Sequence, residues 1–191
     1  MSRAGPIPEA IRAEMRGRSW RDDPRCPRFE DLALVEVEHR GLDGAIHAGE
    51  LIVAAAVASE VLEIFARILA ADFPIARMHR IDRYDADDEA SMAADNASCF
   101  CFRTAPSGKL SEHAFGLAID LNPVENPMVI GDRVWPEAGA AYLDRADQRP
   151  GMIVRPGPVV EAFDAAGWSW GGDWTAIKDY HHFQKRPDRA I

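Results

Sequence analysis

The chain has 191 residues, a length that suits one domain with a sizeable core and no need of disulfides. Its composition, 47% hydrophobic and 28% charged, is ordinary for a globular protein. The net charge of −9 argues against a nucleic-acid-binding domain, which usually carries a basic stripe, and against docking on anionic lipid. No segment has the roughly 18 consecutive apolar residues of a membrane span.

The N-terminus and the cysteines indicate the compartment. Residues 1–20 lack the apolar core of a secretory signal, so no export signal is visible and synthesis in the cytoplasm is expected. The three cysteines are Cys26, Cys99 and Cys101. An odd number of cysteines without a signal favours reduced thiols over a disulfide framework.

The predicted elements follow one another without an internal repeat. Residues 1–30, rich in proline, arginine and charge, predict an irregular N-terminal arm with one short helix, and residues 31–191 predict a single domain. In chain order we expect a strand at 31–40, a helix at 51–71, strands at 75–84, 98–103 and 117–122, a helix at 159–168 and a strand at 180–184. This order predicts an α+β fold with mainly antiparallel pairing.

Residues 111–120, SEHAFGLAID, place a histidine seven positions before an aspartate. Gly116 allows a sharp turn before the predicted strand, so His113 can return over the strand face on which Asp120 stands. The pair could hold one metal ion. The same spacing also fits a surface histidine in a turn and an acid at a strand end.

A second unusual segment, WSWGGDWTAIKDYHHFQ, covers residues 168–184. An aromatic core accounts for its three tryptophans but not for the run DYHH. A catalytic zinc site needs three protein ligands and an open position for water. His113 and Asp120 supply two, and either His181 or His182 supplies the third.

The remaining carboxylate of the second segment, Asp179, is then a candidate general base. Zinc lowers the pKa of its bound water toward about 7, so a nearby carboxylate can take the proton. Asp179 and His182 have opposite parity in a strand, so a turn or bulge near Tyr180 must bring both inward.

Together these residues resemble the D-alanyl-D-alanine carboxypeptidase family of zinc peptidases, which includes L-alanyl-D-glutamate endopeptidases of bacterial and phage origin. The resemblance rests on three motifs, S-x-H-x-x-G-x-A-x-D, W-G-G-x-W and D-x-x-H-F, and covers residues 96–184 firmly and 41–95 loosely. It implies a small, mainly antiparallel sheet with helices on one side and a zinc site on the sheet face, as in the hedgehog signalling domain.

The resemblance also assigns roles. It implies His113, Asp120 and His182 as Zn²⁺ ligands, preferring His182 to His181, and Asp179 as the base. Gln184 stands where family members commonly carry an acid. This departure can change the affinity of the site or the rate of the reaction, but it leaves the set of metal ligands unchanged.

Further roles concern the substrate. The resemblance implies that Arg103 polarises the scissile carbonyl or holds a substrate carboxylate, against the alternative of a surface charge. Ser111 either contacts substrate or shapes its loop, and Trp170 is expected in substrate binding. Cys99 and Cys101 share a predicted strand face with Arg103, but a fourth ligand would close the site, so we do not expect them to bind metal. The other histidines, His39, His47 and His79, are expected to be structural or exposed.

The expected function is hydrolysis of an amide bond in the peptide stem of peptidoglycan, of the carboxypeptidase or the endopeptidase type. Action at the cell wall is expected, and a phage lysin released by a separate protein would need no signal. One alternative is a hedgehog-like module that holds zinc and binds a partner, and another is a cytoplasmic dipeptidase. The presence of both Asp179 and Arg103 favours an enzyme.

Overall fold

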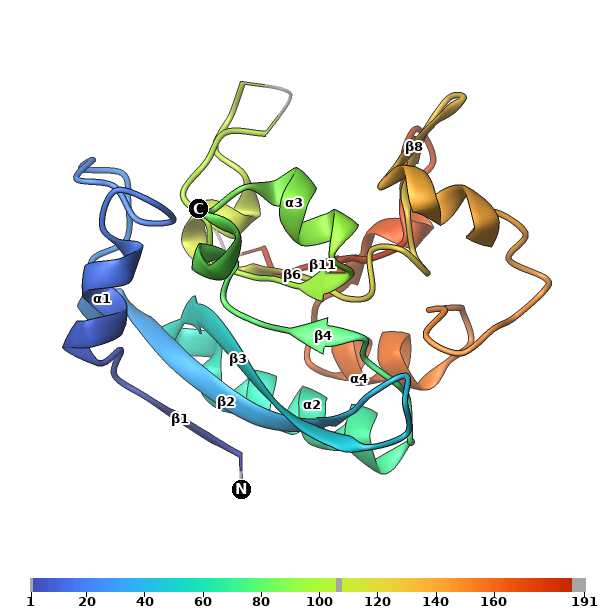
Figure 1. Ribbon diagram of the computed structural model, residues 1–191, viewed down its shortest axis with the longest axis horizontal. Helices are drawn as coiled ribbons and strands as arrows, with labels where there is room; N and C mark the ends of the chain where they lie inside the picture. Colours follow the sequence, from blue (N-terminus) through green and yellow to red (C-terminus); the bar gives the residue numbers. More distant parts are fainter. Residues whose placement is uncertain (1, 106–107, 187–191) are drawn as a thin grey trace.

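The computed structural model describes residues 2–105 and 108–186, which form several small sheets and four α-helices (Figure 1). The first sheet is antiparallel, in the order β1 (Arg3–Gly5), β2 (Leu32–Arg40) and β3 (Ile46–Ala54). The α-helices are α1 (Glu9–Met15), α2 (Ala58–Ala70), α3 (Asp88–Ala93) and α4 (Pro158–Ala165).

Helix α2 packs on β2 and supplies much of the core. Its buried residues recur at helical spacing: Val61, Ile64, Phe65 and Ile68. They join buried side chains of β2 and β3 in one apolar cluster, which also contains Ile119 beside the candidate site. The core therefore lies directly beneath the strands that carry the candidate metal ligands Asp120 and His182.

The helix expected over 51–71 is wrong in its first part. Residues 51–54 end β3, which pairs along its whole length with β2, and the α-helix begins only at Ala58. The β-branched pair Ile52 and Val53 is well suited to a buried strand, and the preceding glycine-rich turn returns the chain as a hairpin.

The strands expected over 75–84 and 98–103 are mostly absent. Within 75–84, β4 (Arg77–Met78) forms and pairs in parallel with β5 (Asn96–Ala97), which ends before residue 98, and residues 81–84 form a 3₁₀ turn. The main chain of residues 98–103 instead hydrogen-bonds to other segments, including Cys101 N to His113 O. This tertiary pairing satisfies the backbone without a regular ladder.

Two further antiparallel sheets lie in the C-terminal half. One has the order β6 (Ala118–Asp120), β11 (His182–Gln184) and β9 (Ser169–Trp170). The other has the order β10 (Lys178–Asp179), β7 (Met128–Ile130) and β8 (Arg133–Trp135). The proline-rich passage 123–158 thus holds two strands and a 3₁₀ segment, Glu137–Tyr142.

The α+β prediction is confirmed in coarse form: strands pair mainly antiparallel, in several small sheets where one was expected. The likeness to the hedgehog fold stays a prediction, as does the boundary between residues 1–30 and the rest. Within the arm, β1 pairs with β2, and Ile7 and Met15 are buried in a second apolar cluster. Among the described residues, no helix is long and apolar enough to cross a membrane.

Candidate metal centre

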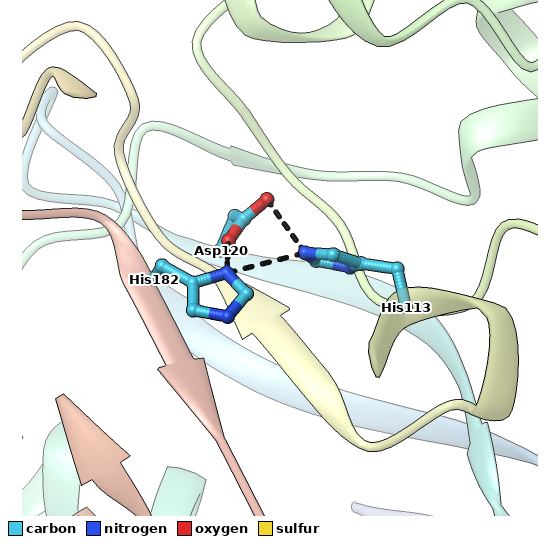
Figure 2. Close-up of side chains that lie close together, drawn as sticks. All are labelled: His113, Asp120 and His182. Carbon is cyan, nitrogen blue, oxygen red and sulfur yellow. Dashed lines mark hydrogen bonds and ion pairs between the residues drawn. The ribbon is translucent and has the colours of Figure 1, made fainter. Parts of the chain in front are cut away.

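Three side chains from three elements meet at one point (Figure 2). His113 comes from the 3₁₀ turn η4 (Glu112–Phe115), Asp120 ends β6, and His182 begins β11. Asp120 Oδ2 lies 3.1 Å from His113 Nε2, and Oδ1 lies 2.9 Å from His182 Nδ1. The two ring nitrogens are 3.3 Å apart, and all three side chains are buried.

The local sequence explains how His113 reaches the strand. Ser111 precedes η4, and its Oγ accepts a hydrogen bond from His113 N at 3.3 Å. Gly116 ends η4 with φ +66°, in the left-handed region. A Cβ there would lie 2.5 Å from Ala54 N, so only glycine fits between the turn and β3. Ser111 therefore shapes the loop.

The outer nitrogen of each imidazole is held by a neutral oxygen. His113 Nδ1 lies 2.6 Å from the Cys99 carbonyl oxygen, and His182 Nε2 lies 3.2 Å from Gln184 Oε1. If each outer nitrogen donates its proton, His113 Nε2 and His182 Nδ1 present lone pairs toward Asp120. Two neutral imidazoles and a carboxylate suit Zn²⁺, so the donor set fits the metal that the family resemblance implies.

The electrostatics keep the central carboxylate ionised. Burial alone would raise the pKa of Asp120, but the nearby His113 and His181 and the short contacts of its oxygens with the ring nitrogens of His113 and His182 outweigh burial, so its pKa lies well below the usual range. For His182, burial works to lower the pKa, and the hydrogen bond and charge of Asp120 outweigh it and raise the pKa.

Asp179 and His182 lie on either side of a turn at residues 180–181, as their parity requires. Asp179 ends β10, and its Oδ1 lies 3.0 Å from His181 Nε2. His181 Nδ1 in turn lies 2.8 Å from Asn126 O. His181 is therefore engaged with Asp179 and the main chain, and it lies outside the group of three that could hold a metal ion.

The ion pair fixes the environment of Asp179. Burial works to lower the pKa of His181, but the charges of Asp179 and Asp120 outweigh it and raise that pKa to about 9. Gly171 makes room for this strand, since a Cβ there would lie 2.5 Å from Asp179 O. His181 is a partner of the candidate base that sequence reasoning did not identify.

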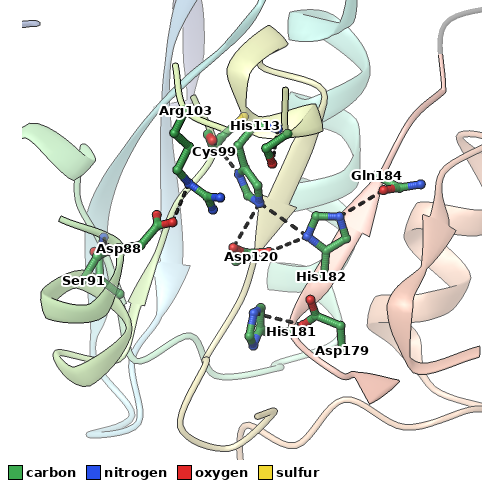
Figure 3. A network of polar contacts seen from close by, with 12 residues as sticks. Asp88, Ser91, Cys99, Arg103, His113, Asp120, Asp179, His181, His182 and Gln184 are labelled. Carbon is green, nitrogen blue, oxygen red and sulfur yellow. Dashed lines mark hydrogen bonds and ion pairs between the residues drawn. The ribbon is translucent and has the colours of Figure 1, made fainter. Parts of the chain in front are cut away.

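Arg103 lies on the opposite side of the centre from Asp179 (Figure 3). Its Nε forms an ion pair with Asp88, the first residue of α3. Burial raises the pKa of Asp88, and the charges of Arg103 and His113 oppose that rise. Asp88 is a second residue that sequence reasoning missed, because nothing distinguishes it within the acidic run DADDE.

The cysteines are free, and their thiols stay outside the metal cluster. Cys99 is fully buried in the core, and burial raises its pKa well above the usual value. Burial and the charge of Asp88 raise the pKa of Cys101 to about 12. Both thiols are therefore protonated at neutral pH, the form that does not bind metal well.

A cavity of about 930 Å³ opens beside His182. Its lining includes Trp174, whose ring centroid lies 5.4 Å from that of His182, and Gln184. Trp170 does not reach this cavity: it is 5% exposed, packs in the core, and its Nε1 donates to Tyr180 O. Of the two tryptophans in the motif, Trp174 is the one placed to meet a ligand.

Three other histidines line a separate cavity of about 410 Å³. His39 and His47 face each other across the β2–β3 hairpin, with ring centroids 5.7 Å apart. His47 is paired with Asp43, and His79 lies near the hydroxyl of Tyr84. Among the described residues, only His113, Asp120 and His182 form a group whose ligand atoms converge within 4.8 Å.

Comparison with known proteins agrees with the motifs. Residues 104–185 match the model of a family described as D-alanyl-D-alanine carboxypeptidase. The match includes His113, Asp120 and His182, and also Asp179. The predicted family resemblance is therefore confirmed over this segment. No solved structure matches the chain.

Proposed function

We propose that this chain, which matches that peptidase family over residues 104–185, is a zinc metallopeptidase that hydrolyses an amide bond in the peptide stem of bacterial peptidoglycan. The observation that carries the proposal is the convergence of His113, Asp120 and His182 within 4.8 Å. A carboxylate that only stabilised the fold would not need two buried histidines directed at it.

The chain's own residues would divide the work. His113 Nε2, Asp120 and His182 Nδ1 would hold Zn²⁺, which when bound supplies a Lewis acid that polarises a carbonyl and activates water. Asp179 would accept the proton of the attacking water at a carboxylate oxygen and pass it to the leaving amine. Because His181 Nε2 lies 3.0 Å from Asp179 Oδ1, the proposed base would be held in place by a neighbour that is not one of the three proposed ligands.

Arg103 would act on the substrate from the other side of the centre. Its guanidinium is permanently charged and can donate two parallel hydrogen bonds, to a developing oxyanion or to a substrate carboxylate. The cavity beside His182 would receive the peptide, with Trp174 as an apolar wall.

The decisive experiment is incubation of purified protein with defined stem peptides, followed by identification of the products by mass. Loss of a terminal D-alanine indicates a carboxypeptidase, and cleavage between L-alanine and D-glutamate indicates an endopeptidase. We expect a chelator to stop cleavage and added Zn²⁺ to restore it.

Matched samples separate the alternatives. Cleavage of free dipeptides but not of stem peptides would favour the dipeptidase. Tight zinc binding with no cleavage of either substrate would favour a binding module. Cleavage that persists in a fully metal-free preparation would contradict the proposal.

A further inference from the structure

Arg103 is a long, flexible side chain that needs a partner if it is to point at a substrate. Its main chain is already fixed, because Ser111 N donates to Arg103 O at 3.1 Å within the loop that carries His113. The side chain itself is 30% exposed, and four rotatable bonds would let it sample many rotamers. Main-chain anchoring therefore does not determine where the guanidinium lies.

Asp88 supplies the missing constraint. Its carboxylate pairs with Nε of Arg103, and the pair is only about a third exposed on either side. Figure 3 shows the terminal nitrogens of Arg103 turned away from Asp88, toward the side on which His113 lies. A guanidinium held through Nε keeps both terminal nitrogens free to donate, whereas a lysine ammonium is one compact charge that cannot pair with Asp88 through one nitrogen and reach a substrate through others.

Asp88 is itself held firmly. It is the first residue of α3, and the preceding Asp87 caps that helix by accepting a hydrogen bond from Ala90 N at 3.1 Å. The far end of α3 is tied to β5 by Asn96 Nδ2, which donates to Ser91 Oγ at 3.1 Å. Because Asp87 provides the cap, replacement of Asp88 should leave the helix in place.

We propose that Asp88 is a positioning residue, which orients Arg103 so that its terminal nitrogens face the substrate at the metal centre. This inference rests on the proposed peptidase function. The competing explanation is a partly exposed ion pair that contributes little to stability and nothing to activity.

A double-mutant cycle tests the inference through activity. Asp88→Ala should lower kcat/KM by about 10-fold to 100-fold, because a misplaced donor loses transition-state contact. If Asp88 acts only through Arg103, the double variant Asp88→Ala/Arg103→Ala should be no slower than Arg103→Ala alone. The kcat/KM of Asp88→Asn should lie between those of wild type and Asp88→Ala, since the amide keeps an oxygen acceptor but loses the charge.

The same kinetics distinguish the two roles left open for Arg103. A drop in kcat would mean that the guanidinium acts on the scissile carbonyl, and a rise in KM that it holds a substrate carboxylate. Glu89→Gln is the matched control, because it removes an exposed acid from the same helical turn and should leave both constants unchanged. Zinc content should be full in every variant.

A second readout does not depend on activity. In protein labelled with ¹⁵N at arginine Nε, the Arg103 signal, assigned by its loss in Arg103→Lys, should exchange slowly in wild type and rapidly in Asp88→Ala. Slow exchange in a wild type that cleaves no stem peptide would refute the proposed function but leave the pair intact. Additive losses in the cycle, or wild-type kinetics in Asp88→Ala, would overturn the positioning role.

Discussion

His182 stands directly opposite Asp120 in the register of β11 and β6, and its Nδ1 lies 2.9 Å from Asp120 Oδ1. His181, one residue earlier, lies in the turn and contacts Asn126 O and Asp179. Adjacent histidines thus have separate partners, which makes the pair a sensitive test of the site.

We expect His182→Ala to lose bound zinc and activity together, because one of three ligands is gone. His181→Ala should keep its zinc, since its ring nitrogens contact Asn126 and Asp179. Activity should nonetheless fall, because Asp179 loses the partner that fixes it. Zinc content measured by elemental analysis in both folded variants decides the matter, and equal loss of metal in both would contradict the assignment.

Asp179→Asn separates a general base from a group that only orients a neighbour. The amide keeps the shape of the carboxylate but cannot accept the proton, so we expect full zinc occupancy, normal folding and almost no turnover. The measurements are zinc content, thermal unfolding and single-turnover cleavage of a stem peptide. Near-wild-type cleavage with zinc in place would show that Asp179 is not the base.

Gln184 is expected to set metal affinity through His182. Its Oε1 lies 3.2 Å from His182 Nε2, so Gln184→Ala should weaken zinc binding by roughly 10-fold to 100-fold. Gln184→Glu should bind zinc at least as tightly as wild type, because a carboxylate is the stronger acceptor. Competition with a fluorescent chelator gives both affinities, and an unchanged affinity in Gln184→Ala would remove this role.

Glu125 is expected to make stability depend on pH. Burial raises the pKa of Glu125 to about 8, and a hydrogen bond with Asp95 and the negative charge of Asp95 add to this rise. The folded state therefore binds a proton at Glu125 more tightly than the unfolded chain does. The resulting contribution to the free energy of unfolding is fully present below about pH 4.3 and is lost as pH rises through about 8. Glu125→Gln should flatten that loss and raise the Tm relative to wild type near pH 8. An identical pH dependence of Tm in both proteins would contradict this.

The sequence was enough to predict the central cluster, because short motifs carried it. His113 and Asp120 are joined by a tight turn and one strand, and local chemistry decides both. The prediction that a helix begins at residue 51 was wrong because the apolar run 51–54 fits a buried helix as well as a buried strand. Only its pairing with β2 in the folded chain selects the strand. Asp88 could not be found, because its partner lies fifteen positions further along and the pairing exists only in the folded chain.

The three candidate ligands belong to segments that meet only on folding, since His113 and His182 are 69 positions apart in the chain. A metal ion held by both would act as a reversible cross-link across that loop, and the unfolded chain has no such site to offer. Affinity for the ion then adds directly to resistance against unfolding, by an amount that grows with the logarithm of free metal concentration. Metal depletion in the cell would therefore limit not only turnover but also how long the chain survives proteolysis.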